Sequence, residues 1–170
     1  MEEPSVKIGL RTIKTGLSVF ICILISIVFH RETYVVAALT AVFTLREDMI
    51  NTLKFGKHRV VGNTFGAMFS IVAIFLFKLF GDGKEVQLFI MPLLIIFMIS
   101  LLSHFGYQEG TVGACATLLT ILFMIPETES YHYAFARVID SFIGMFVAIG
   151  VNQLLPNRKM LKDLEKQLNN

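Results

Sequence analysis

The chain has 170 residues, of which 55% are hydrophobic and only 16% carry a charged side chain, and its formal net charge is +2. Soluble globular domains average about 25% charged residues, so this composition indicates a chain that is nearly all membrane domain and argues against a soluble enzyme. The Lys and Arg residues cluster between apolar runs instead of forming one basic face, which argues against nucleic acid as a partner.

Six apolar runs follow one another along the chain, at 12–29, 33–45, 60–80, 86–103, 111–125 and 135–155. Helices are expected for all six, because the alternating pattern of membrane β-strands is absent. Polar or turn-forming breaks separate the runs, and the longest break is 46–58. We therefore predict an all-α protein with six transmembrane helices in residues 1–156, followed by a short cytoplasmic helical tail at 157–170.

The distribution of Lys and Arg predicts the orientation in the membrane. If both termini share one side, that side receives eleven of the 15 Lys and Arg residues. The other side receives Arg31, Lys78, Lys84 and Arg137. Under the positive-inside rule both termini are expected in the cytoplasm, with the lipid bilayer of the cell membrane as the surrounding medium.

A short motif occurs in both halves of the chain. Arg59-Val60-Val61 has Gly66 seven residues after its Arg, and Arg137-Val138-Ile139 has Gly144 seven residues after its Arg. Each motif opens the third helix of its half, and three crossings separate the two motifs. This spacing predicts a three-plus-three inverted repeat, a common plan in secondary transporters.

The second helix of each half is predicted to be short, because runs 33–45 and 111–125 reach only about 20 to 23 Å at 1.5 Å per residue. Short segments at corresponding positions of two halves indicate a binding site. Both carry hydroxyl residues at helical spacing, and these are Thr40, Thr44, Thr117 and Thr120. They either let helices approach closely or line a polar pathway between these two helices.

The third helix of each half carries small residues four apart, which favours close helix packing. These are Gly62 and Gly66 in the first half, and Gly144 and Ala148 in the second. The packing partner is either another helix of the same chain or a second copy. Asn63 and Asn152 lie in the same two helices and are expected to hydrogen-bond between helices.

Three ionisable residues are candidates for chemistry. Arg137 and Asp140 share a helix face and form either an intrahelical ion pair or a proton-coupling carboxylate beside an anion-attracting arginine. Arg59 either reaches the inner headgroups or, with Arg137, places a guanidinium at each mouth of a pathway. The histidines and cysteines lack metal-ligand spacing, and no nucleotide motif appears, so neither a metal nor a cofactor is expected.

Several landmarks together resemble the N-terminal membrane domain of the bacterial aromatic acid exporter family. They are Arg11–Gly16, Ala38–Val42, Gly56–Arg59 with Gly66-Ala67, and Arg137 through Gly144 to Asn152 and Pro156. That family belongs to a fusaric-acid-resistance-like superfamily, to which plant aluminium-activated malate channels also look related. The resemblance implies a six-helix unit, a homodimer, and passage of organic anions, typically aromatic carboxylates.

The chain departs from the family pattern in two places. Members commonly continue into a cytoplasmic helical domain, whereas this chain ends at Asn170, and Leu45–Asp48 stands where many members have a Pro-Thr pair. The residues and the resemblance together favour a gradient-driven exporter of small organic anions. The alternatives are a passive anion channel and a membrane assembly or regulatory subunit that transports nothing.

Overall fold

The computed structural model of the chain describes residues 10–30, 34–81, 83–126 and 129–155. These residues form six α-helices and one 3-10 helix. The helices are α1 (Leu10–Val28), α2 (Tyr34–Thr44), α3 (Met49–Phe80), α4 (Lys84–His104), η1 (Gln108–Gly110), α5 (Thr111–Met124) and α6 (Ser130–Leu154). The prediction of an all-helical chain is confirmed. The proposed tail at 157–170 lies outside the described residues.

The predicted break at 46–58 is wrong for most of its length, because α3 begins at Met49. Asp48 caps this helix, and its carboxylate accepts a hydrogen bond from the Asn51 backbone N–H at 2.7 Å. Lys54 and Lys57 lie on the exposed side of the added turns, while Thr52 and Gly56 are buried one turn apart. The polar stretch is therefore an amphipathic start to the helix. At the other end Gly81 stops the helix with a φ of 95°, which glycine adopts without strain.

Four helices are long and apolar enough to cross a membrane, and these are α1, α3, α4 and α6, with 19, 32, 21 and 25 residues. The expected shortness of the second and fifth helices is confirmed. Helix α2 has 11 residues and α5 has 14, so they rise about 16 and 21 Å against a hydrocarbon core of about 30 Å.

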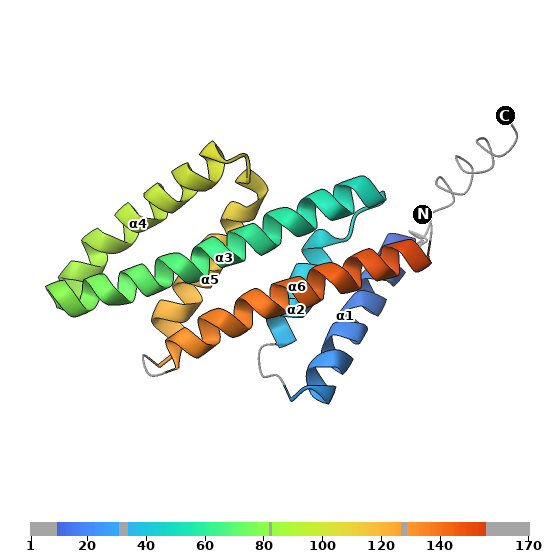
Figure 1. Ribbon diagram of the computed structural model, residues 1–170, viewed down its shortest axis with the longest axis horizontal. Coiled ribbons are helices and arrows are strands. Elements are labelled where there is room, and N and C mark those ends of the chain that lie inside the picture. The colour runs from blue at the N-terminus through green and yellow to red at the C-terminus, as the bar shows by residue number, and fades with distance from the viewer. Residues whose placement is uncertain (1–9, 31–33, 82, 127–128, 156–170) are drawn as a thin grey trace, which may run out of the picture.

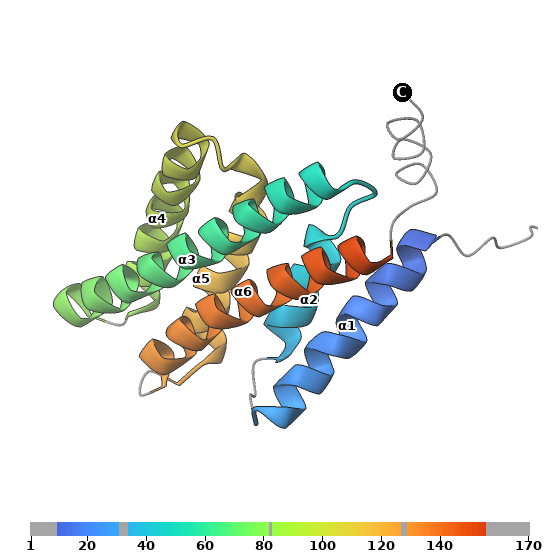
Figure 2. The ribbon, with the colours of Figure 1, turned by 45° about the vertical axis from the view of Figure 1, so that its right-hand side comes forward.

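The helices form two layers with two flanking members. Helices α3 and α6 lie side by side, and the short helices α2 and α5 pack behind them (Figure 1). Helix α1 flanks α2 and α6 on one edge, and α4 flanks α3 on the opposite edge (Figure 2). Helix α3 contacts α5 and α6 most extensively, while α2 packs mainly on α6. Each short helix is thus held against the long helix of the other half.

Two ends of the molecule are useful references below. At the Lys14 end, α1 and α3 begin and α6 ends, as the hydrogen bond between Lys14 and Asn152 shows. At the Lys78 end, α3 and α5 end and α6 begins, where Lys78 and Ser130 line one cavity.

Glycines allow the closest helix contacts. A Cβ atom on Gly62 would lie 2.2 Å from the carbonyl oxygen of Gly110, and one on Gly66 would lie 2.4 Å from that of Ala114. A Cβ on Gly144 would lie 2.2 Å from the carbonyl oxygen of Ala37. These three glycines therefore pack within the chain, where any side chain would push the helices apart. Ala148 is fully buried further along α6.

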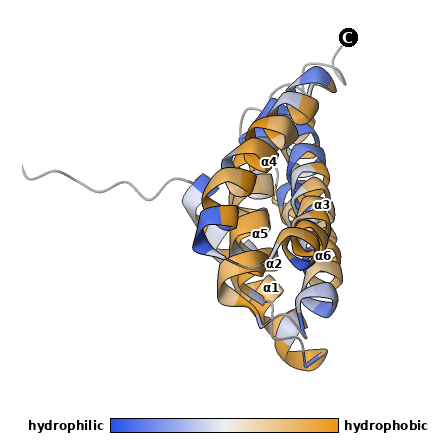
Figure 3. Cartoon of the chain, turned by 90° about the vertical axis from the view of Figure 1, so that its left-hand side faces the viewer, coloured by the Kyte–Doolittle hydropathy of each residue, from blue (hydrophilic) through white to orange (hydrophobic). Residues whose placement is uncertain are grey.

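Many large apolar side chains are exposed on the outside of the molecule, and residues of hydrophobic colour make up much of the helices (Figure 3). Exposed examples are Phe20, Phe75, Phe89, Phe97 and Phe146. Many fully buried apolar residues are small, among them Ala37, Ala41, Ala73, Ala114 and Ala148. This arrangement is the reverse of a water-soluble core and is typical of helices packed in lipid.

Candidate functional site

A network of polar side chains is buried where α3 crosses α6. Asn63 of α3 is 2% exposed and donates a hydrogen bond through Nδ2 to Ser141 Oγ of α6. Thr117 of α5 donates to Asn63 Oδ1 at 3.1 Å. The amide of Asn63 therefore joins three helices, which confirms the expected interhelical role of this residue.

Arg137 brings a positive charge into this network. Its side chain is buried, with 8% of the residue exposed. Its Nε donates to Thr117 Oγ1 at 2.8 Å, and Nη1 lies 3.4 Å from the Tyr133 hydroxyl. The hydroxyl of Ser141 donates back to the Arg137 carbonyl oxygen at 2.8 Å. These bonds orient the guanidinium and use only part of its five N–H donors.

Arg59 of α3 approaches α5, the helix that carries Thr117. Its guanidinium carbon lies 4.6 Å from the centre of the Phe43 ring. Its Nη1 would be 2.9 Å from a Cβ on Gly113, so the guanidinium rests against the bare backbone of α5. The Nε of Arg59 is buried and has no hydrogen-bond partner among the described residues. A buried N–H donor without an acceptor costs free energy unless a ligand or a water molecule accepts its hydrogen bond.

The two arginines were expected at opposite mouths, and the structure places them closer together. Gly113 and Thr117, which the two side chains approach, are one turn apart on α5. The reason is that Asn63 and Ser141 meet at the helix crossing, and each arginine lies four residues before one of them. We call Arg59, Asn63, Thr117, Arg137 and Ser141 the arginine cluster.

The predicted pathway threonines divide into three groups. Thr117 is at the centre of the arginine cluster. Thr40 and Thr44 are fully buried on α2, and their hydroxyl oxygens have no hydrogen-bond partner among the described residues. The hydroxyl of Thr120 donates to the Ala116 carbonyl oxygen of its own helix at 2.7 Å. Asp140, the candidate for proton coupling, is fully buried on α6.

The arrangement is chemically suited to an anion. The guanidinium groups of Arg59 and Arg137 face α5 at Gly113 and Thr117, and the buried Nε of Arg59 has no hydrogen-bond partner among the described residues. A guanidinium binds a carboxylate through two parallel hydrogen bonds, and burial strengthens such a contact. No group of three or more His, Cys, Asp or Glu side chains that could hold a metal occurs within the described ranges.

A second polar network at the Lys14 end was missed from the sequence. Lys14 is 1% exposed, and its Nζ donates to Asn152 Oδ1 at 2.7 Å. Asn152 Nδ2 donates to Thr52 Oγ1 at 2.9 Å, and Thr52 donates in turn to the Asp48 carbonyl oxygen at 2.8 Å. The backbone N–H of Arg46 also donates to Thr52 Oγ1. This network ties α1, α3 and α6 together and confirms the interhelical role of Asn152.

The sequence contained a signal for Lys14. The four buried residues of α1 are Lys14, Ser18, Cys22 and Ser26, each one helical turn from the next. Lys14 was interpreted only as a topology signal, although it continues this row of small or polar residues on an otherwise apolar helix. A lysine that continues such a stripe is expected to point between helices.

The Asp48 cap yields a prediction on stability. Hydrogen bonds from the Asn51 backbone and side chain lower the pKa of the Asp48 carboxyl. Its stabilising effect is therefore present above the ordinary Asp pKa and is lost as the pH falls through the lowered value. We expect Asp48→Ala to cost about 1 kcal/mol at pH 7 in thermal unfolding in detergent. Asp48→Asn, which keeps the acceptor, should lose less and remove this pH dependence; equal losses would contradict the capping role.

Comparison with known proteins gives the family. A family model described as "Aromatic acid exporter family member 1" matches residues 6–155. A UPF0421 protein of Staphylococcus epidermidis is 31% identical over 161 residues, which cover 95% of this chain and 47% of the relative. A UPF0421 protein of Staphylococcus saprophyticus is 30% identical over 162 residues, with 95% and 47% covered.

A UPF0421 protein of Staphylococcus aureus strain USA300 is also 30% identical, over 163 residues, with 95% and 47% covered. The chain thus spans about half the length of the curated relatives it matches. No solved structure matches the chain. The family model covers most of the chain and includes every helix described above, so this protein belongs to the aromatic acid exporter family.

Proposed function

We propose that this chain forms the membrane pathway of a gradient-driven exporter for small organic anions, with aromatic carboxylates as the substrate class. Membership of an aromatic acid exporter family supports a membrane transporter. The convergence of the buried Arg137 and the half-buried Arg59 side chain on α5 carries the proposal for an anion. A carboxylate placed between Arg59 and Arg137 would accept a hydrogen bond from the unpartnered Nε of Arg59 and would neutralise part of the positive charge.

An inverted repeat would explain how the pathway is built. Gly66 of α3 packs on Ala114 and Thr117 of α5, and Gly144 of α6 packs on Ala37 and Thr40 of α2. Each glycine thus meets an Ala-x-x-Thr segment in the second helix of the other half. This reciprocal contact supports the repeat inferred from the Arg and Gly spacing. Under this proposal α2 and α5 also cross the membrane, as short helices that line the pathway.

The proposed orientation puts the Lys14 end in the cytoplasm. Lys14, Arg46 and Lys54 all belong to segments at this end, and the ion pair of Lys54 with Glu109 joins α3 to η1 at 3.3 Å. The positive-inside rule places such an end on the cytoplasmic side of the cell membrane. A homodimer is proposed for the assembly, because the family resemblance implies one.

Flux measurement in proteoliposomes tests the proposal. Protein reconstituted at a fixed orientation should move radiolabelled benzoate, and a proton gradient across the membrane should drive it against its own gradient. Flux that only runs downhill, with single-channel currents, would indicate a passive channel instead. The absence of flux for a panel of aromatic and aliphatic carboxylates would overturn the transport proposal in favour of an assembly subunit.

Asp140 is the proposed proton-coupling residue, because it is a fully buried carboxyl three residues from Arg137 on α6. We expect Asp140→Asn to keep downhill benzoate flux but to lose uphill transport driven by the proton gradient. Counterflow and pH-jump uptake in the same vesicles separate these two activities. Uphill transport at the wild-type rate in the variant would contradict the coupling role.

A further inference from the structure

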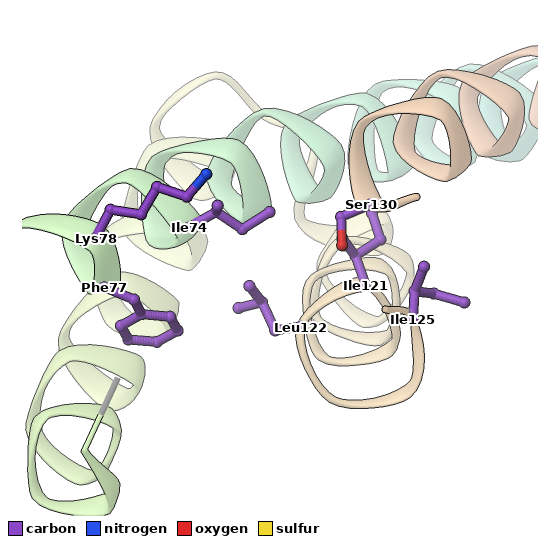
Figure 4. Close-up of a pocket in the computed structure, with 7 residues that line it drawn as sticks. All are labelled: Ile74, Phe77, Lys78, Ile121, Leu122, Ile125 and Ser130. Atoms are coloured by element: carbon purple, nitrogen blue, oxygen red, sulfur yellow. The ribbon is translucent and has the colours of Figure 1, made fainter. Parts of the chain in front are cut away.

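A cavity of about 290 Å³ opens at the Lys78 end, between α3, α5 and α6. Its walls are Ile74, Phe77, Ile121, Leu122 and Ile125, with Lys78 and Ser130 at its edge (Figure 4). Three helices supply this lining, so the cavity depends on their packing and not on one loop.

The lining combines an apolar body with one cation. The Lys78 side chain extends along the cavity with its amino group on the cavity side, opposite Ser130 (Figure 4). Lys78 is the single ionisable residue among those that line it. The Ser130 hydroxyl donates to the Pro126 carbonyl oxygen at 3.1 Å, which keeps it near the edge. Apolar walls with a few placed polar groups are typical of small-ligand sites, and an ammonium with three donors favours a carboxylate.

An apolar barrier lies between this cavity and the arginine cluster. Ile121, one turn beyond Thr117 on α5, is 1% exposed and packs with Ala67, Ile74 and Ala134. Both Ile74 and Ile121 also line the cavity. An anion in the cavity would therefore need only this thin layer of side chains to move before reaching Arg137.

We propose that the cavity is a second binding subsite for amphipathic monocarboxylates, separated from the arginine cluster by a gate of Ala67, Ile74, Ile121 and Ala134. The inference rests on the proposed transport function. Substrate at the Lys78 end would bind in this cavity before it reaches the arginine cluster. The volume is adequate, since a cavity of about 150 Å³ can hold a benzene molecule. A single ring with its carboxylate fits within 290 Å³.

Photolabelling of the 170-residue chain in detergent tests the subsite directly. 4-Azidobenzoate should label the α5 segment around Leu122 and Ile125, and unlabelled benzoate should compete. Lys78→Met removes the charge and keeps an apolar stem, so we expect labelling to need about tenfold more probe. Leu122→Trp fills the cavity and should abolish labelling there.

Two matched variants control for unspecific effects. Lys84→Met removes an exposed lysine at the same end, and Phe123→Trp adds an indole on the exposed side of the same helix. Both should label like the wild type. The subsite proposal would be overturned if Lys78→Met and Leu122→Trp label as the wild type does. It would also be overturned if the wild type is not labelled. Labelling that oleate blocks and benzoate does not would assign the cavity to lipid and overturn it too.

The outcome is separable from that of the proposed function. Benzoate flux with unchanged labelling in the cavity variants refutes the subsite and leaves transport standing. Specific labelling of the cavity without flux in proteoliposomes refutes transport and leaves a carboxylate-binding cavity. Lys78→Met is expected to raise about tenfold the benzoate concentration that gives half-maximal entry from the Lys78 end.

Discussion

Replacement of Arg137 by alanine is expected to lower benzoate flux in proteoliposomes at least a hundredfold. The substitution removes a buried guanidinium that would bind the substrate carboxylate, and it leaves Thr117 without its donor from α6. A hydrogen bond that involves a charged group contributes about 1.5 to 3 kcal/mol, and two such bonds to a carboxylate account for the loss. Arg137→Lys keeps the charge but not the paired donors, so an intermediate flux is expected.

The same assay on Arg59→Ala tests whether the two arginines act together. If both hold one carboxylate, the double variant should be hardly worse than either single variant, because the effects of coupled groups are not additive. Arg11→Ala is a suitable control, since this arginine is exposed at the start of α1. Wild-type flux in Arg137→Ala protein that still elutes as a single species would exclude the arginine cluster from the pathway.

The largest effect on stability is expected from Gly144→Ala. The added methyl carbon would lie 2.2 Å from the Ala37 carbonyl oxygen and 2.8 Å from Thr40 Cβ, so α2 and α6 must separate. Backbone atoms cannot give way as a flexible side chain can, and overpacking of this kind costs about 1 to 3 kcal/mol or more. We expect a clear fall in the midpoint of thermal unfolding in detergent.

Gly150→Ala, in the same helix, is the matched control with the opposite expected sign. No atom lies within 4 Å of a Cβ built at Gly150. Alanine has the higher helix propensity, which favours the folded state by up to about 1 kcal/mol. Equal changes in the two variants would show that the contact of α2 with α6 does not limit stability.

Much of the local structure could be predicted from residue pattern alone. Apolar runs predicted the six helices, and the short second and fifth runs are short helices in the structure. The glycines at 62, 66 and 144 were identified as packing positions, and each meets the backbone of another helix. These features depend on side-chain type and on a period of 3.6 residues, both of which are local properties.

The residue pattern gave a wrong prediction where charged residues lie within a helix. The polar stretch from 46 to 58 looked like a break, although an amphipathic helix continues through most of it. Counting apolar residues underestimates the length of a helix whose first turns are amphipathic. The same error put Arg59 at a helix end, whereas ten residues of α3 precede it.

The sequence by itself determined the helices, their apolar outer faces and the residues that share each face. Only the tertiary structure decided that Arg59 and Arg137 approach neighbouring turns of α5, that Lys14 reaches Asn152, and that a cavity opens beside Lys78. The physical reason is that periodicity assigns side chains to a face but not to a partner. Which faces meet depends on where the backbones come close, and that is a property of the helices packed together.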